Sequence, residues 1–200
     1  METKQKNSKT VNGVDTAQLS ENMNAIKETP ELSRFKFRVS NRWIEGTYNQ
    51  ASVNSYFGIQ KEHETRKPMI FDIDEPPVLL GQDRGPNPVE YLLVGLSGCV
   101  TTALIAHAAA RGIKVNGLET FLEGDLDVQG FLGMSETIPV GYQGITIRFK
   151  IDADMTDLEK EELIQLAQKY SPVLASVMNP VPVNLKLHKE TEEKGESHEN

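Results

Sequence analysis

A run of twenty residues without a charged side chain, Tyr91–Ala110, constrains the fold of this chain more than any other feature. Glu90 and Arg111 flank the run, and its length would just span a bilayer. Glycine, serine, threonine and histidine dilute its hydrophobicity, however, and no second segment could join it in a membrane. We therefore predict a helix buried on all sides within a soluble protein. Pro88 suits its first turn, and Gly112 suits the position just after its last turn.

Composition narrows the class of protein. The chain has 21 basic and 29 acidic residues, a net charge of −8, so it lacks the basic footprint that nucleic-acid binding requires. Its one cysteine excludes an internal disulfide framework and a CxxC zinc or redox motif. The first ten residues contain no apolar stretch, so we expect no signal peptide and a cytoplasmic location.

The ends of the chain differ from its middle. Residues 1–30 read as a flexible N-terminal extension, with a possible short helix over 15–28 and a loose segment over 1–12. Residues 189–200 contain five acidic and two basic side chains and no apolar one, so they are predicted to form a disordered acidic tail. The single folded domain is expected between residues 31 and 188.

Alternation of apolar and polar residues predicts most of the domain as strands. The outer face of residues 119–127 is acidic and that of residues 148–150 is basic, which would suit cross-strand pairs if the two strands are neighbours. We read a break between the first two strands near Arg42 to Gly46. The predicted strands cover residues 35–40, 47–57, 69–73, 118–128, 145–151 and 181–188.

Capping signals predict two further helices. Thr156 and Glu159 form a capping box before residues 157–169. Ser171 reads as the N-cap of a short helix that ends before Pro180, with a proline at its first position. The residues of the longer helix expected to face the core are Leu158, Leu163, Leu166 and Ala167.

The lone Cys99 has two interpretations. A free cysteine in the middle of a buried helix usually packs as a small hydrophobic side chain. A reactive thiol would need a nearby positive charge to favour the thiolate, and neither neighbour along the helix supplies one. His107 is about 12 Å further along the helix and reads as a core or interface histidine. The acidic cluster at residues 72–75 lacks the spacing of a calcium loop, and we predict no metal site.

Three stretches together resemble a known family. They are NPVEYLLVGLSGCVTTALIAHAAARGI, LEGDLDVQGFLG and YSPVLASVMNPVPV. The chain resembles the OsmC/Ohr family, the osmotically inducible and organic hydroperoxide resistance proteins, over roughly residues 33–188. The resemblance implies an α+β fold in which two chains intertwine as a homodimer, with curved antiparallel sheets around long central helices.

The same resemblance implies a reactive site. Active members of the family are two-cysteine peroxidases, and Cys99 falls on the cysteine that attacks the peroxide. Arg42 falls on or near the arginine that stabilises the thiolate, with Arg38 as the alternative if the register slips. No cofactor and no metal is implied.

Two positions depart from the family pattern. The resolving cysteine falls at Ser171, and because serine cannot form a disulfide, two-cysteine turnover within one chain is impossible. The glutamate that holds the arginine falls at Val89, and Glu90 stands one place later. One residue on a helix is a rotation of about 100°, so Glu90 need not face the same partner.

Three functions therefore stay open. The first is a thiol-dependent, one-cysteine reductase of organic hydroperoxides in oxidative or osmotic stress, in which an external thiol reduces the oxidised Cys99. The second is a non-catalytic homodimer that binds a small apolar ligand in the same pocket. The third is a structural or stress-associated protein with surface partners. None of them involves nucleic acid or a membrane.

Overall fold

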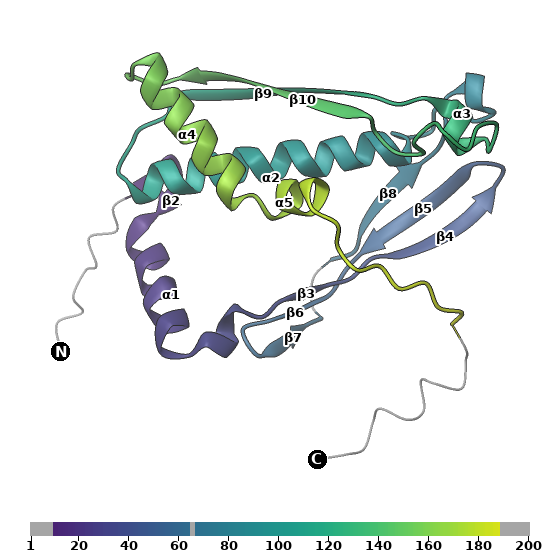
Figure 1. Cartoon of the computed structure of the whole chain (residues 1–200). Helices are drawn as coiled ribbons and strands as arrows, with labels where there is room; N and C mark the ends of the chain where they lie inside the picture. The colour runs from purple at the N-terminus through teal and green to yellow at the C-terminus, as the bar shows by residue number, and fades with distance from the viewer. Residues whose placement is uncertain (1–9, 65–66, 189–200) are drawn as a thin grey trace, which may run out of the picture.

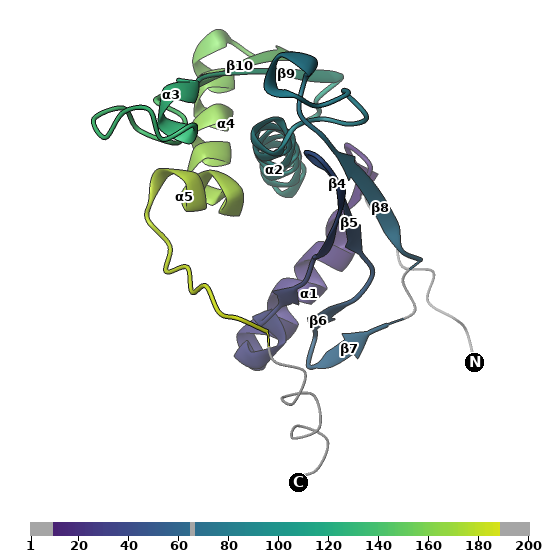
Figure 2. The same ribbon diagram turned by 90° about the vertical axis from the view of Figure 1, so that its right-hand side faces the viewer.

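The chain folds as a mixed α+β domain around one long helix, α2 (Figure 1). The computed structural model describes residues 10–64 and 67–188. A view nearly along α2 shows β9 and β10 above it, α4 and α5 on one side, and β4, β5 and β8 on the other (Figure 2). The elements in chain order are β1 (Thr10–Val11), β2 (Val14–Asp15), α1 (Thr16–Glu28), η1 (Pro30–Ser33), β3 (Lys36–Phe37), β4 (Ser40–Glu45), β5 (Tyr48–Val53), β6 (Tyr56–Gly58), β7 (Lys61–His63), β8 (Met69–Ile73), η2 (Pro77–Leu79), α2 (Pro88–Ala110), β9 (Gly117–Asp125), α3 (Val128–Phe131), β10 (Gly144–Asp152), α4 (Asp157–Tyr170) and α5 (Pro172–Met178).

Local signals at both ends define α2. Asn87 is the N-cap and forms a capping box with Glu90, in which each side chain accepts a hydrogen bond from the other residue's backbone N–H. Pro88 occupies the first turn. Gly112 follows the last turn with φ +72°, a conformation that glycine adopts at little cost. The predicted helix is confirmed, and it begins three residues earlier than its charge-free run.

The chain buries only one side of α2, contrary to our expectation of burial all round. Leu96 and Leu104 are fully buried. On another side Leu92 is 40% exposed and Val94 is 57% exposed, and a side chain added at Gly95 would meet open space. By length and composition, α2 is the one described helix that could cross a membrane. One side of α2 nevertheless packs in the core of the domain, so a membrane span does not explain why the other side is exposed.

The core of the domain lies between α2 and α4. Leu104 and Ala108 of α2 pack with Leu163 and Ala167 of α4, and partly buried side chains of β9 and β10 cover this cluster. Helix α4 begins with the predicted capping box of Thr156. The prediction that Leu158 faces this core is wrong. Leu158 is 67% exposed, because at about 100° per residue it lies about 140° around α4 from Leu163 and on the opposite side from Ala167.

Strands β9 and β10 pair antiparallel over nine residues each, so the condition set for the expected cross-strand pairs is met. Lys150 Nζ lies 2.6 Å from Glu119 Oε1, and Arg148 lies 2.8 Å from Glu123. These exposed ion pairs are the cross-strand pairs that the acidic and basic faces predicted. Strand β9 is shorter than expected at its end, because Asp127 caps α3 and removes Val128 from the strand.

Strands β3 to β8 form two small sheets, ordered β4-β5-β8 and β3-β6-β7. The expected break near Arg42 to Gly46 is correct only at its end, because Arg42 lies inside β4, opposite Gln50 of β5. The turn falls later, at Gly46 with φ +51°, where the Trp43 indole N–H donates to the Gly46 carbonyl. The strand predicted over residues 47–57 is divided between β5 and β6.

Residues 181–188 form no strand, contrary to the prediction. Their alternation is intact, but a strand needs a hydrogen-bonded neighbour, and within the described part of the chain this segment has none. Val183 is 76% exposed and Leu185 is 95% exposed. The apolar side chains that would face the core in a sheet are therefore exposed in this segment.

The predicted helix over residues 15–28 is confirmed as α1, capped by Asp15. Residues 10–12 are not loose as expected. Thr10 and Val11 pair with β2, and the Asn12 side chain bonds to the backbone of Ile113 and Val115 at 2.9 Å each. Residues 1–9 and the predicted acidic tail at 189–200 lie outside the described residues.

Candidate functional site

Cys99 lies midway along α2, where the start of α5 meets the helix. Its thiol is partly exposed. The Val173 backbone N–H points at it, with 3.5 Å between the nitrogen and Sγ. This donor comes from a residue 74 positions away in the chain. Cys99 is therefore not packed as a fully buried small hydrophobic side chain, which is how its position in the helix was first interpreted. The residue is half-buried, and its sulfur has a backbone donor from α5 on one side.

Ser171 and its proline set where that donor lies. Ser171 is only 1% exposed, and its Oγ accepts a hydrogen bond from Leu174 N–H at 3.3 Å, as a predicted N-cap does. Pro172 has no N–H, so the Val173 N–H is the first backbone donor of α5. The structure thus places Ser171, the residue expected at the resolving position, beside the same short helix that contacts Cys99.

An apolar hollow of about 210 Å³ adjoins α5. Val100, next to Cys99 in the chain, forms part of its wall on α2, and Leu174 forms part of its wall on α5. The amide of Gln168 is the polar side chain among its lining residues. The other residues that line it are Ile147, Phe149, Ile164 and Met178.

Neither candidate arginine contacts Cys99 within the described part of the chain. Arg38 makes a bidentate ion pair with Glu62, with nitrogen–oxygen distances of 2.9 and 2.8 Å, which lowers the pKa of that carboxyl. Arg42 shares a sheet face with Gln50, its cross-strand neighbour. Phe71, whose ring contacts Tyr91 of α2, lies on the opposite face by strand alternation. Arg42 therefore points away from the helix that carries the thiol.

Glu90 is engaged in the capping box of α2. Its carboxylate accepts from Asn87 N–H at 2.8 Å. The carbonyl of Val89, the residue expected at the position of the glutamate, accepts from the Tyr142 hydroxyl at 2.9 Å. Burial, with a smaller effect of the Glu90 charge, raises the pKa of Tyr142. A role for Glu90 in holding an arginine stays a prediction.

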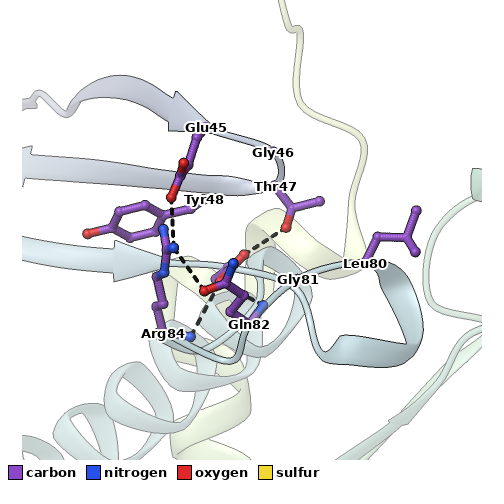
Figure 3. Close-up of a pocket in the computed structure, with 9 residues that line it drawn as sticks. Glu45, Gly46, Thr47, Tyr48, Leu80, Gly81, Gln82 and Arg84 are labelled. Carbon is purple, nitrogen blue, oxygen red and sulfur yellow. Dashed lines mark hydrogen bonds and ion pairs between the residues drawn. The ribbon is translucent and has the colours of Figure 1, made fainter.

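A polar cluster that the sequence did not reveal joins the β4–β5 turn to the loop before α2 (Figure 3). Asp74 is 2% exposed and accepts from the Thr47 hydroxyl at 2.7 Å, and from the backbone N–H groups of Glu75, Gln82 and Arg84. These hydrogen bonds lower the pKa of Asp74, and the bond from Thr47 has the largest effect.

Arg84 completes this cluster. Its guanidinium lies 2.7 Å from Glu45 and over the ring of Tyr48. Because these groups already bond to one another, the cluster serves to attach the loop. Among the described residues no three metal-ligating side chains converge.

Sequence comparison assigns the chain to a family. The model of the family described as OsmC-like protein matches residues 81–186, which include Cys99 and Ser171. The chain belongs to the OsmC-like family. Among functionally curated proteins, none matches the chain.

Solved structures of OsmC-like proteins have the same fold. An OsmC-like protein from Mycoplasma pneumoniae is 18% identical and superposes with a TM-score of 0.56 over 72% of this chain and 89% of its own. An OsmC-like protein of unknown function from Vibrio cholerae is 12% identical, with a TM-score of 0.54 over 70% and 92%. A Legionella pneumophila organic hydroperoxide resistance protein OsmC is 16% identical, with a TM-score of 0.51 over 70% and 89%. At these identities the likeness concerns the fold.

The far end of α2 in this OsmC-like protein holds a stacked histidine. The His107 ring lies 4.4 Å from that of Tyr170, the residue before the Ser171 cap. Burial lowers the pKa of His107 below its ordinary 6.5, and the positive charge of Arg111 adds a smaller lowering. The sequence interpretation of His107 as a packed histidine agrees with this stacking.

The lowered pKa of His107 predicts a loss of stability in mild acid. The unfolded chain binds this proton more readily than the folded one, so the contribution is complete above pH 6.5 and declines as the pH falls through the folded-state value. Urea unfolding at about pH 7.5 and about pH 5.5 measures the decline. His107→Phe keeps a ring on Tyr170 without a titrating group, so we expect it to lose less stability than the wild type. Equal losses would contradict this assignment.

Proposed function

We propose that this protein is a one-cysteine, thiol-dependent reductase of organic hydroperoxides that acts through Cys99 in oxidative or osmotic stress defence. The Val173 N–H directed at Cys99 Sγ is the observation that carries the proposal. The thiolate is the nucleophile in such a reaction, and the Val173 N–H is a donor placed beside the sulfur that would attack. Membership of the OsmC-like family and the adjacent apolar hollow support the choice of an organic peroxide.

The reaction has two stages. The Cys99 thiolate attacks the outer oxygen of ROOH, the O–O bond breaks, and the alcohol ROH leaves with the hydroperoxide proton, so that Cys99 becomes a sulfenate. Once protonated, the sulfenic acid reacts with an external thiol to form a mixed disulfide and water. A second external thiol then releases the Cys99 thiol and leaves as the oxidised disulfide. Ser171 takes no part in this disulfide exchange.

We also propose that the active form is an intertwined homodimer. The open side of α2 around Leu92 and Gly95 and the uncovered alternating segment 181–188 are surfaces that a second copy would bury. Because Arg42 points away from its own α2, a partner's Arg42 is the group we expect beside Cys99. Sedimentation at micromolar concentration tests the assembly. A mass near twice 22.3 kDa supports the dimer, and a mass of 22.3 kDa contradicts it.

Single-turnover kinetics test the chemistry. Pre-reduced protein is mixed with one equivalent of cumene hydroperoxide in a stopped-flow instrument, and the mass of the Cys99 peptide is measured afterwards. Rapid stoichiometric loss of peroxide with one added oxygen on Cys99 is expected. A thiol that stays reduced over minutes would contradict the proposed function.

Substitution of Arg42 separates the two candidate arginines. Arg42→Ala is expected to slow oxidation of Cys99 by cumene hydroperoxide at least tenfold, because a nearby cation favours both the thiolate and the peroxide oxygens. Arg38→Ala is the matched control, since Arg38 is already paired with Glu62. An equal effect of the two substitutions, measured by the same stopped-flow assay, would show that Arg42 has no special role.

Ser171→Cys should restore a resolving cysteine. The cap of α5 lies two residues before the Val173 donor that touches Cys99 Sγ, so a thiol at position 171 is expected to trap the sulfenic acid as a disulfide. After one equivalent of peroxide, the variant should lose two hydrogens in mass and fail to react with dimedone, whereas the wild type should react. Dimedone labelling of both proteins alike would contradict this geometry.

A non-catalytic ligand-binding protein is the second candidate. The observation in its favour is that no arginine or lysine contacts Cys99 within residues 10–64 and 67–188. The rate of Cys99 alkylation by iodoacetamide across a pH series distinguishes the two functions. A profile like that of a free cysteine peptide favours the binder, and a profile shifted to lower pH that Arg42→Ala abolishes favours the reductase.

A further inference from the structure

We propose that the stacked rings of His107 and Tyr170 hold the start of α5 in place beside Cys99. Both are positioning residues, because they act on the sulfur only through the Val173 N–H. Their ring centroids lie 4.4 Å apart, with 29° between the ring planes. The consequence for peroxide reduction rests on the proposed function, whereas the placement of α5 does not.

Helix α5 has few contacts of its own that could fix its position. None of the seven residues of Pro172–Met178 is buried. Within the described residues, the bond from Val173 N–H to Cys99 Sγ is its one hydrogen bond to a residue outside 171–179. Sulfur is a weak acceptor, so this bond alone does not fix a helix. The position of α5 therefore depends on the chain that leads into it.

A joint of one residue leads from α4 into α5 (Figure 1). Ser171 is the C-cap of α4 and the N-cap of α5, and it is 1% exposed. Its Oγ accepts from the Leu174 N–H, which ties the cap to the first turn of α5. The chain from Tyr170 to Val173 spans at most about 11 Å, so the joint has little slack. A displacement at the end of α4 is therefore passed on to the Val173 donor.

The ring stack attaches the end of α4 to α2. The buried residues of α4 are Leu163 and Ala167, so the core contact stops before the last residues of the helix. Tyr170 lies beyond them and is 46% exposed, and its ring stacks on the ring of His107. Arg111 Nη1 lies 3.4 Å from His107 Nδ1, a contact that orients the imidazole. Removing either ring should therefore loosen the end of α4 and the joint after it.

Hydrogen exchange of the Val173 N–H, followed by NMR in the full reduced chain, tests the proposal. This N–H lies in the first turn of α5 and has no acceptor within that helix, so its protection reports the contact with Cys99. His107→Ala and Tyr170→Ala are each expected to raise its exchange rate about two- to tenfold, the range of one aromatic pair. Because Tyr170 is half exposed, Tyr170→Ala leaves the core intact even if His107→Ala does not fold.

Two further variants distinguish positioning from a general loss of stability. His107→Phe keeps a ring on Tyr170 and should restore the protection of the Val173 N–H. His63→Ala removes a second histidine–tyrosine stack, whose centroids also lie 4.4 Å apart, and should leave that protection unchanged. Unchanged exchange at Val173 in the folded alanine variants of the proposed stack would overturn the proposal. No recovery in His107→Phe would overturn it as well.

Stopped-flow oxidation of Cys99 by cumene hydroperoxide relates this positioning to the proposed function. We expect Tyr170→Ala to slow the oxidation, by no more than the same two- to tenfold, because the donor beside the sulfur is displaced. His107→Phe should react as the wild type does. Faster exchange at Val173 without slower oxidation would overturn the role in the reaction. A wild type whose Cys99 does not react, while the exchange at Val173 responds as expected, would count against the proposed function alone.

Discussion

Replacing Cys99 with serine is expected to abolish single-turnover consumption of cumene hydroperoxide. The chain has one cysteine, so no other thiol can take over as the nucleophile. A serine hydroxyl at the same place stays protonated at neutral pH and cannot form a sulfenic acid. We expect the rate to fall to that of peroxide in buffer, a loss of several orders of magnitude, measured in the stopped-flow assay.

Structural integrity of Cys99→Ser is the necessary control. Its circular dichroism spectrum and its sedimentation mass should match those of the wild type, because serine is close to cysteine in size and can still accept the Val173 N–H. Retention of peroxide consumption by the folded variant would mean that Cys99 is not the reacting group. The one-cysteine mechanism would then be wrong.

Leu163→Ala is expected to cause a large loss of stability. Leu163 is 2% exposed and packs between Leu104 and Ala108 of α2, so truncation leaves a cavity at the only large buried side chain that α4 contributes within the described residues. Leucine-to-alanine substitutions at such positions cost about 2–5 kcal/mol. Urea unfolding at fixed protein concentration measures the difference.

Leu158→Ala, on the same helix, is the matched control. Leu158 is 67% exposed, so the same chemical change should alter the free energy of unfolding by about 0.5 kcal/mol or less. The two substitutions together also test which side of α4 packs against the core. A large cost at Leu158 in the assembled protein would mean that a second copy covers the first turn of α4.

The sequence predicted the elements whose signals are local. Pro88, the capping box at Thr156 and the N-cap at Ser171 predicted the starts of α2, α4 and α5 within a few residues. The opposite charges of β9 and β10 predicted cross-strand ion pairs for the case that these strands are neighbours, as they are. Each of these signals depends on residues three or four apart, or on alternation along one strand, so it can be recognised in the sequence alone.

The candidate site required more than local signals. Cys99 was found because it is the only cysteine, and its relation to Ser171 came from resemblance to the family. The Val173 N–H donor was missed, because a contact between backbone and sulfur 74 residues apart leaves no mark in composition or spacing. The Asp74 cluster was missed for the same reason, since its carboxylate was read as part of a loop entrance.

What the sequence by itself determined is the position of α1, α2, α4 and α5, the strand character of β9 and β10, and the presence of a single thiol. Tertiary structure decided which side of each element is buried and which distant groups meet. Residues 181–188 show why: they alternate as a strand does, but within the described residues no neighbouring strand pairs with them. Burial and long-range hydrogen bonds depend on where other segments lie, and periodicity along one segment carries no information about that.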